Sequence, residues 1–445
     1  MSKNLRWYLR MEDKNLYQKV KKKLNKLIHV FGPGVTTGAA DDDPSGIATY
    51  SQTGAQFGYG QLWTVLFMYP LMTAIQEATA RIGAVSGKGL AAVIRQNYNK
   101  KILYTVVLLV VVANTINIGA DIGAMAAAAE LIIPLPFIVL AIVSTALILV
   151  LEIFTSYAVY SKILKWLTLS LLAYPITAFI IGQPWGEIIK ATFIPHIEFS
   201  FGFLFIITAV LGTTISPYMF FWEASQEVEE EIAQGRVNRI GGIPRISRFF
   251  IKNLRLDNII GMFASEVTAW FIIIVAATVL HSSGVTNIAT AADAAKALEP
   301  LVHNFPNAGF LAKTIFAIGI IGLGLLGIPI LAGSASYALS EAFNWHEGLY
   351  RKLKEAHGFY GILTIATLIG LLINFIGINP IKALIFTAVI NGAVAVPLIF
   401  LIARIARNKK IMGDYQSGYL SNALVWTTFV IMATAVLAMF FTIGR

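Results

Sequence analysis

The stretch Gly38-Ala-Ala-Asp-Asp-Asp-Pro-Ser-Gly-Ile47 decides the fold, because it places three adjacent carboxylates inside an apolar run from Leu27 to about Met68. One charge at the centre of a membrane-inserted helix costs about 2.5 to 3.5 kcal/mol, so these aspartates are not expected to face lipid. Pro44 lacks an N–H and Gly46 tolerates unusual dihedral angles, so we expect the helix to unwind here and to free backbone carbonyls. Such backbone survives at membrane depth only where it is buried in protein or lines a watery site. Carboxylates and free carbonyls together suit a hard cation.

The composition indicates an all-α polytopic membrane protein. The 445 residues have a mean hydropathy of +0.71, and only 13% of them are charged, about half of the fraction usual in soluble domains. The chain has no cysteine, which excludes disulfides, zinc–thiolate sites and thiol chemistry. A net charge of +10 is typical of basic cytoplasmic loops in a membrane protein, so we do not expect a nucleic-acid partner.

Eleven apolar spans are predicted along the chain. They cover about 27–56, 62–85, 102–131, 134–157, a fifth ending near 182, 199–226, 258–280, 310–338, 359–376, 381–403 and 422–441. A basic N-terminal arm, 1–26, predicts a cytoplasmic N-terminus. Basic clusters at 81–101, 162–165, 236–255, 351–354 and 404–410 then fall on the same side. We therefore expect a multi-pass protein of the cytoplasmic membrane with its C-terminus outside.

Two interrupted spans indicate an internal repeat. Pro217, within Gly212-Thr-Thr-Ile-Ser-Pro-Tyr218, interrupts the sixth span as Pro44 interrupts the first. Each break opens a block of five spans, predicted at 27–182 and 199–403, and 404–445 adds a basic loop and the eleventh span. Because five is odd, the second block is inverted, which is the architecture of many secondary transporters. Two ordinary proline kinks are the simpler alternative.

The residues around both breaks resemble those of the Nramp family of divalent-metal transporters. Asp43-Pro-Ser-Gly46 followed by Thr53-Gly-Ala-Gln-Phe-Gly-Tyr59 is similar to the family's Asp-Pro-Gly-Asn motif and the stretch after it. The segment 212–218 lies where the family has Ala-x-x-Met-Pro-His. The resemblance implies a leucine-transporter-like fold with broken helices 1 and 6. It also implies metal ligands at the Asp43 carboxylate and the Thr213 carbonyl.

The departures from the family pattern concern the metal ligands. Gly46 stands where the family has asparagine, and Ser216 stands where it has methionine. A thioether selects transition metals over magnesium, so its loss leaves a roomier site that contains only oxygen ligands. Mg²⁺ usually keeps several waters, and a partly hydrated ion would fit such a site. The pattern resembles the Nramp-related magnesium transporters and predicts transport of Mg²⁺ and Mn²⁺, with Ser45 and Tyr218 assisting.

The same comparison argues against proton coupling. The family's histidines in and after the second motif correspond to Tyr218 and Glu223, and its acidic pair in the third span corresponds to Asn117 and Ala120. The ninth predicted span contains no arginine. Without such a relay we expect uniport driven by the concentration gradient and the membrane potential. A proton-coupled Mn²⁺ or Fe²⁺ symporter using Asp121 or Glu223 is the alternative within the same fold.

Four further residues are candidates for the ion pathway. Asp42, with Asp41 beside it, would line the cytoplasmic route to Asp43. Asp121 is either a supporting acid or a hydrogen-bonded structural carboxyl, and Glu223 would line a hydrated exit path. Asn391 in the tenth span is a weaker candidate.

Other functions remain open from the sequence. A sodium-coupled symporter of organic solutes would also use broken helices, although the aspartate triplet disfavours an anionic substrate. An intramembrane aspartyl protease would need a Gly-x-Gly-Asp signature, which the sequence lacks. A metal sensor that does not transport is a further possibility. The preferred interpretation is a transporter rather than an enzyme, without a cofactor, and the sequence leaves protein partners undetermined.

Overall fold

The computed structural model describes residues 32–154 and 171–442. The predicted basic arm, 1–26, and parts of the first, fourth and fifth predicted spans lie outside the described residues. Within the described part the secondary structure is helical and contains no strand. Eight helices in this part are long and apolar enough to cross a membrane, and the chain is a multi-pass membrane protein.

The helices follow the predicted order closely. The first half contains α2 (Pro33–Asp41), α3 (Pro44–Phe57), α4 (Trp63–Ser86), α5 (Leu90–Asn97), α6 (Lys100–Glu130), α7 (Phe137–Phe154), α9 (Ala173–Ile180) and α10 (Trp185–Phe193). The second half contains α11 (Phe201–Thr214), α12 (Pro217–Ala233), α13 (Arg248–Ala276) with η2 (Ala277–His281), α14 (Ala291–Ala295), η3 (Lys296–Leu298), α15 (Glu299–Val302), α16 (Ala308–Phe343), α17 (His357–Ile373), η4 (Asn374–Ile376), α18 (Pro380–Ala406), α19 (Lys409–Met412) and α20 (Tyr419–Phe441).

Both predicted helix breaks are present. The first separates α2 from α3 at Asp42 and Asp43, and the second separates α11 from α12 at Ile215 and Ser216. Pro44 and Pro217 each open the following helix, where a missing N–H removes no helical hydrogen bond. The all-α fold with broken first and sixth spans is therefore confirmed.

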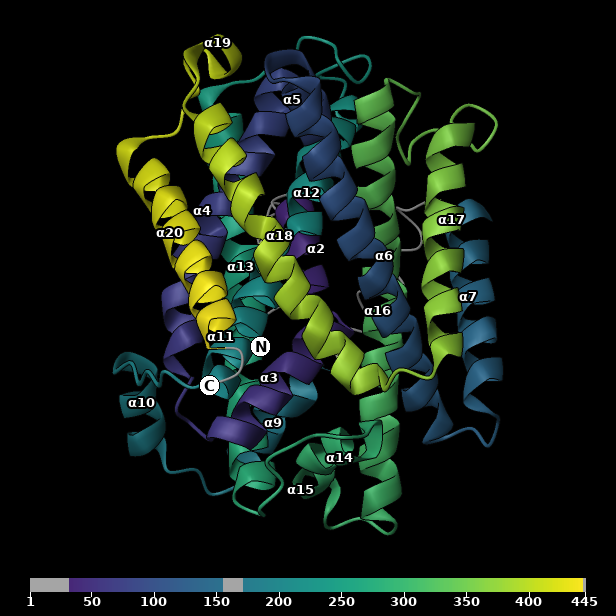
Figure 1. Cartoon of the computed structure of the whole chain (residues 1–445), viewed down its shortest axis with the longest axis vertical. Coiled ribbons are helices and arrows are strands. Elements are labelled where there is room, and N and C mark those ends of the chain that lie inside the picture. The colour runs from purple at the N-terminus through teal and green to yellow at the C-terminus, as the bar shows by residue number, and fades with distance from the viewer. Residues whose placement is uncertain (1–31, 155–170, 443–445) are drawn as a thin grey trace, which may run out of the picture.

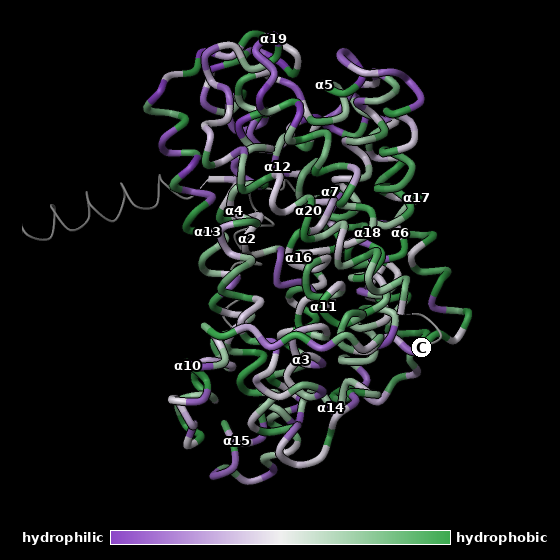
Figure 2. Tube along the Cα trace, turned by 60° about the vertical axis from the view of Figure 1, so that its left-hand side comes forward, coloured by the Kyte–Doolittle hydropathy of each residue, from purple (hydrophilic) through white to green (hydrophobic). Residues whose placement is uncertain are grey.

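The two ends of the molecule differ in their connections. In Figure 1, α5 and α19 lie at one end of the long axis and α10, α14 and α15 lie towards the other. Hydrophilic residues gather in the connections at the ends, whereas the long helices between them are mostly hydrophobic (Figure 2). Large apolar side chains such as Leu108 and Leu372 are more than half exposed, as expected where helices face lipid.

Small residues bring the broken helices against their neighbours. A Cβ atom on Gly38 of α2 would lie 2.4 Å from the carbonyl oxygen of Gly261 in α13. A Cβ atom on Gly212 of α11 would lie 1.9 Å from the carbonyl oxygen of Ala388 in α18. Only glycine permits these backbone approaches, which hold α2 on α13 and α11 on α18.

The structure corrects several predicted boundaries. Helix α13 begins at Arg248, before the predicted start at 258, and Ser247 caps it by accepting a hydrogen bond of 3.2 Å from Phe250 N. Short helices α5, α10, α14, α15 and α19 were not among the predicted spans. Hydropathy predicts only the part of a helix that lies within the membrane. The helix itself continues into polar surroundings wherever its end is capped and packed. The division into repeats at 27–182 and 199–403 stays a prediction.

Candidate metal site

Asp43 lies at the first helix break and caps α3. Its backbone is extended, and its Oδ1 accepts a hydrogen bond of 2.8 Å from Gly46 N. Its Oδ2 lies 3.4 Å from both Asn117 Nδ2 on α6 and the Tyr218 hydroxyl on α12. The residue is only 2% exposed. One carboxylate oxygen is therefore fixed by the helix end, while the other makes only long contacts and is available to a ligand.

The second break lies next to the first. A Cβ atom on Gly46 would lie 3.1 Å from the Asp41 carbonyl oxygen and 3.6 Å from Thr213 Oγ1. Tyr218 also donates to the Ala40 carbonyl at 3.1 Å and so joins α12 to the end of α2. The absence of a side chain at Gly46 therefore lets the two helix ends approach each other closely.

Ser216 points its hydroxyl back at the end of α11. Its Oγ lies 2.7 Å from the Gly212 carbonyl and 2.8 Å from the Thr213 carbonyl, so its proton is used within the break. The hydroxyl lone pairs and the second lone pair of the Thr213 carbonyl remain as acceptors. The two breaks thus offer one carboxylate, backbone carbonyls and a hydroxyl, all of which are hard oxygen donors.

The site does not contain enough charged side chains to surround a bare metal ion. Within residues 32–154 and 171–442, no three histidine, aspartate or glutamate side chains are grouped closely enough to hold one. A single carboxylate with neutral oxygens suits an ion that keeps part of its water shell. The chemistry of these residues therefore fits a hydrated divalent cation better than a dehydrated one.

Two predicted residues make no side-chain hydrogen bond to Asp43 among the described residues. The hydroxyl of Ser45 donates to the Leu384 carbonyl on α18 at 3.0 Å. Asn391 is buried on α18, and among the described residues its Oδ1 has no hydrogen-bond partner and no hydrogen bond joins it to Asp43. The hydroxyl of Ser45 thus binds α18, and Asn391 is part of α18. Neither side chain is hydrogen-bonded to the Asp43 carboxylate.

A polar face of α6 borders the site. Asn117 contacts Asp43, and Asp121 follows one turn later with neither carboxylate oxygen hydrogen-bonded within the described part of the chain. On α16, a Cβ atom at Gly327 would lie 3.2 Å from Asp43 Cβ and 3.9 Å from Asp121 Oδ2. The contact of Asn117 with Asp43 was not predicted. Its signal was the spacing of Asn114, Asn117 and Asp121, which share one helix face.

A second group of acids surrounds the end of α2. Ser265 on α13 donates to Asp41 Oδ2 at 2.6 Å, and its Oγ lies 3.4 Å from Asp42 Oδ1. The next residue, Glu266, is 3% exposed, and its carboxylate makes no hydrogen bond among the described residues. Sequence reasoning missed Ser265 and Glu266, although a glutamate inside the predicted span 258–280 is itself a signal of function.

Glu223 lies on α12, between α2 and α13. It accepts hydrogen bonds from the Thr37 hydroxyl and, at 3.1 Å, from Asn258 Nδ2. The neighbouring Asp257 accepts hydrogen bonds of 2.8 Å from Gly32 N and Gly34 N and so holds the start of α2. Buried acidic residues thus extend from Asp43 and Asp41 to Glu223 on α12 and Asp257 on α13.

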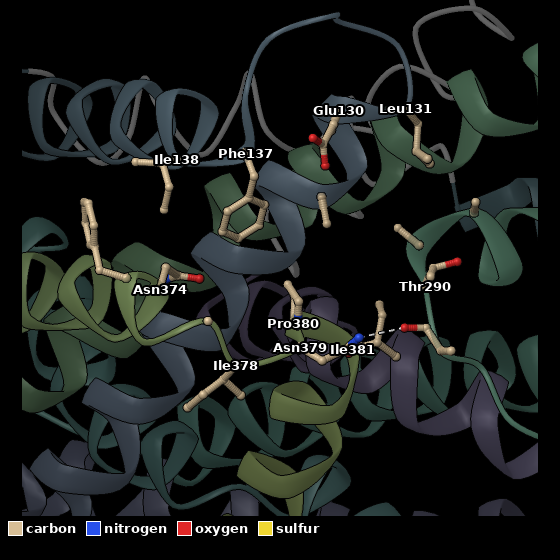
Figure 3. A pocket seen from close by; sticks show the side chains of 16 residues that line it. Glu130, Leu131, Phe137, Ile138, Thr290, Asn374, Ile378, Asn379, Pro380 and Ile381 are labelled. Carbon is tan, nitrogen blue, oxygen red and sulfur yellow. Dashed lines mark hydrogen bonds between the residues drawn. The ribbon is translucent and has the colours of Figure 1, made fainter.

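A cavity of about 720 Å³ lies at the α14 end of the molecule (Figure 3). Glu130, Thr290 and Asn379 line it together with apolar side chains, and Asn379 Nδ2 donates to the Ala289 carbonyl at 2.9 Å. A smaller cavity of about 10 Å³ is lined by Pro44 and by apolar side chains that include Ile47 and Phe316. Asp43 lines neither of these two cavities.

Known structures share the fold. A structure of the Eremococcus coleocola manganese transporter, in complex with an aromatic bis-isothiourea substituted compound, matches with a TM-score of 0.74 and 15% identity. The match covers 94% of this chain and 87% of that one. MHP1, a nucleobase-cation-symport-1 family transporter in a closed conformation with bromovinylhydantoin bound, matches with a TM-score of 0.57 at 12% identity, over 93% of this chain and 92% of that one. MhsT in complex with L-phenylalanine gives 0.58 at 13% identity, over 92% and 98%.

The family assignment comes from the sequence itself. The model of the natural resistance-associated macrophage protein-like (Nramp) family matches residues 34–442, which include both helix breaks and every membrane helix described above. The chain belongs to the Nramp family.

Proposed function

We propose that the protein carries divalent metal ions across the membrane by alternating access and that it accepts Mg²⁺ and Mn²⁺ as partly hydrated ions. The observation that carries this proposal is the donor set at the two breaks. Asp43 Oδ2 makes only long contacts at the first break, and the second break offers the hydroxyl of Ser216 and the carbonyl of Thr213. The similar fold of the Eremococcus coleocola manganese transporter supports a divalent metal as the substrate. In this proposal the ion binds Asp43 Oδ2, the Thr213 carbonyl and Ser216 Oγ, and water completes its shell.

The selectivity follows from what the site lacks. Ser216 supplies a hard hydroxyl at the second break. The site therefore lacks the soft sulfur ligand that would favour d-block ions over Mg²⁺. Gly46 contributes no amide side chain that would replace a water of the ion, and it lies close to the Asp41 carbonyl and Thr213. Mg²⁺ binds proteins mainly through one or two carboxylates and retained waters, and this arrangement provides both.

We propose uniport as the mode of transport. The five histidines within residues 32–154 and 171–442 lie outside the helices of the two breaks and outside α6, so none of these imidazoles forms a relay beside Asp43. A divalent ion moving down an inside-negative potential gains about 4.6 kcal/mol per 100 mV, which is sufficient to drive uptake without protons. A proton-coupled Mn²⁺ or Fe²⁺ symporter is the second candidate, because Asp121 is a buried carboxyl next to Asp43 and makes no hydrogen bond in the described part of the chain.

Metal uptake into proteoliposomes tests the proposal. Mg²⁺ and Mn²⁺ are offered separately, with a pH dye inside the vesicles and a potassium diffusion potential imposed. We expect uptake of both ions, faster at an inside-negative potential, without acidification. Mn²⁺ uptake with acidification and without Mg²⁺ flux would establish the proton-coupled alternative instead.

Two variants assign the roles. Asp43→Asn keeps the size of the side chain and removes its charge, so we expect at least about a hundredfold loss of uptake of both ions, because the only charged ligand disappears. Asp121→Asn is the matched control, and uniport predicts that it leaves the internal pH trace flat. Unchanged uptake by the Asp43→Asn variant would overturn the proposed site.

A further inference from the structure

A second cavity lies at the α5 end of the molecule and shares no lining residue with the Asp43 site. Its volume is about 560 Å³, which is within the usual range of small-molecule sites. Its walls come from the α4–α5 turn, helix α5, the α12–α13 connection and the end of α16 with the connection that follows. Segments that are distant in the sequence therefore enclose one polar space.

Four cations line this cavity, each from a different part of its wall. They are Lys88, Arg95, Arg239 and Arg351. In residues 32–154 and 171–442, the basic partners in ion pairs are Arg81, Arg255, Lys296 and His196, and none of these lines the cavity. Basic loops alone would account for dispersed positive charge at this end, but not for its convergence on one cavity. Unpaired cations around a cavity create a positive potential that attracts an anion.

The two carboxyl groups of the cavity do not cancel this charge. The Glu341 carboxylate offsets only one of the four cations, and it accepts hydrogen bonds from Ala92 N at 3.0 Å and from Ser225 Oγ at 2.9 Å. Glu347 lies in the α16–α17 connection, where burial and then the nearby Glu341 raise its pKa to about 10, so it is protonated at neutral pH. Its Oε2 is buried without a hydrogen-bond partner among the described residues. A neutral carboxyl group can donate a hydrogen bond to an anion.

Hydrogen bonds hold two of the four cationic side chains at the cavity wall. Arg95 donates to Asn344 Oδ1 at 2.7 Å and to the Glu341 carbonyl, and Lys88 Nζ donates to Gln96 Oε1 at 2.8 Å. Gly241 N donates to the Gly87 carbonyl at 2.6 Å, which fastens the connection that carries Arg239 to the α4–α5 turn. The wall is therefore organised before any ligand binds, which lowers the entropy cost of binding.

We infer that this cavity binds a phosphate-bearing anion through Arg239, Arg351 and Lys88. Guanidinium groups pair with phosphate oxygens in a bidentate manner, and a volume of about 560 Å³ accommodates a polyphosphate. A soluble polyphosphate and the phosphate headgroup of a lipid share this chemistry. The inference goes beyond metal transport and does not depend on it, because the site shares no residue with the helix breaks.

Binding is tested on the purified full-length chain in detergent, with EDTA present so that metal chelation plays no part. Sodium tripolyphosphate is titrated by calorimetry at fixed salt. We expect saturable binding that the double variant Arg239→Gln/Arg351→Gln weakens by about tenfold or more, since two charged hydrogen-bonding groups are lost. The matched control is Lys352→Gln/Lys354→Gln, which removes the same charge from exposed positions that do not line the cavity. We expect the control to stay within about twofold.

Further arms separate the possible sources of the phosphate. The titration is repeated with a soluble short-chain phosphatidylglycerol. Binding of the lipid alone identifies a headgroup site, and binding of tripolyphosphate identifies a site for a soluble anion, provided that either is lost in the Arg239→Gln/Arg351→Gln variant. The absence of binding by both ligands, or equal weakening by the control pair, would overturn the inference. If the double variant does not elute as a single species, Lys88→Gln replaces it, with a smaller loss of affinity expected.

Discussion

Ser216 is the residue on which the proposed selectivity depends. Its hydroxyl lies against the carbonyls of Gly212 and Thr213 at the second break. Methionine at this position would add a soft sulfur ligand and reduce the space for water. We expect Ser216→Met to lower the ratio of Mg²⁺ to Mn²⁺ uptake by about tenfold, measured by competition in proteoliposomes. Ser216→Ala, which removes the hydroxyl without adding sulfur, is the control. The same ratio in both variants would exclude a role of sulfur in selectivity.

The titration of Glu347 alone is expected to make the stability of the fold depend on pH. Burial and then Glu341 raise its pKa to about 10 from the ordinary value of 4.5. Between these values the unfolded chain has lost the proton while the folded chain keeps it, so stability falls as the pH rises from 4.5 towards 10. We expect Glu347→Gln to flatten the decrease of Tm between about pH 6 and pH 9, measured by thermal unfolding in detergent.

The control for this pH dependence lies in the same connection. Glu355 is exposed, so Glu355→Gln should leave the slope of Tm against pH unchanged. If Glu355→Gln and Glu347→Gln changed the slope equally, the burial of Glu347 would not be its cause.

At the scale of elements, the contact of α2 with α13 depends on two facing glycines. A methyl group on Gly38 would lie 2.4 Å from the Gly261 carbonyl oxygen, so Gly38→Ala must push the helices apart. Overpacking of this kind costs about 1 to 3 kcal/mol, and we expect a lower Tm. The control is Gly361→Ala on α17, where no atom lies within 4 Å of the added Cβ. There the better helix propensity of alanine predicts a small increase in Tm. Changes in the same direction would contradict this account.

At the scale of the whole molecule, a buried ion pair joins three regions of the fold. Arg81 Nη2 lies 3.1 Å from Glu77 Oε2 on α4 and 2.6 Å from Ser417 Oγ before α20, while Arg255 on α13 reaches Glu77 at 3.2 Å. The side chain of Arg81 is only 2% exposed. Glu77→Gln would leave its guanidinium buried without a countercharge, at a cost of about 3 to 5 kcal/mol, so we expect a large decrease in Tm.

An exposed ion pair provides the control for this prediction. Asp293 and Lys296 pair at 2.9 Å near α14, and both are accessible to solvent. Asp293→Asn should therefore change Tm only slightly, because exposed pairs contribute little. A similar decrease for Glu77→Gln and Asp293→Asn would show that burial does not strengthen the first pair.

Much of the architecture could be predicted, because its signals lie along the chain. Charges, Pro44 and Pro217 inside apolar runs located both helix breaks, and hydropathy located the long helices. The start of α13 at Arg248 could not be predicted in this way, since Ser247 caps a turn beyond the apolar stretch. The contact of Asn117 with Asp43 and the group of Asp41, Asp42, Ser265 and Glu266 were also missed.

The sequence by itself determined that this protein is an all-helical membrane protein with broken helices at Asp43 and Ser216, because each local signal needs only a few neighbouring residues. Only the tertiary structure decided which polar side chains contact one another. It turned Ser45 to Leu384 on α18, brought Asn117 to Asp43 and placed Ser265 beside Asp41. The physical reason is that the direction of a side chain depends on the rotation and close packing of helices that are far apart in the sequence, which glycines such as Gly38 and Gly212 permit.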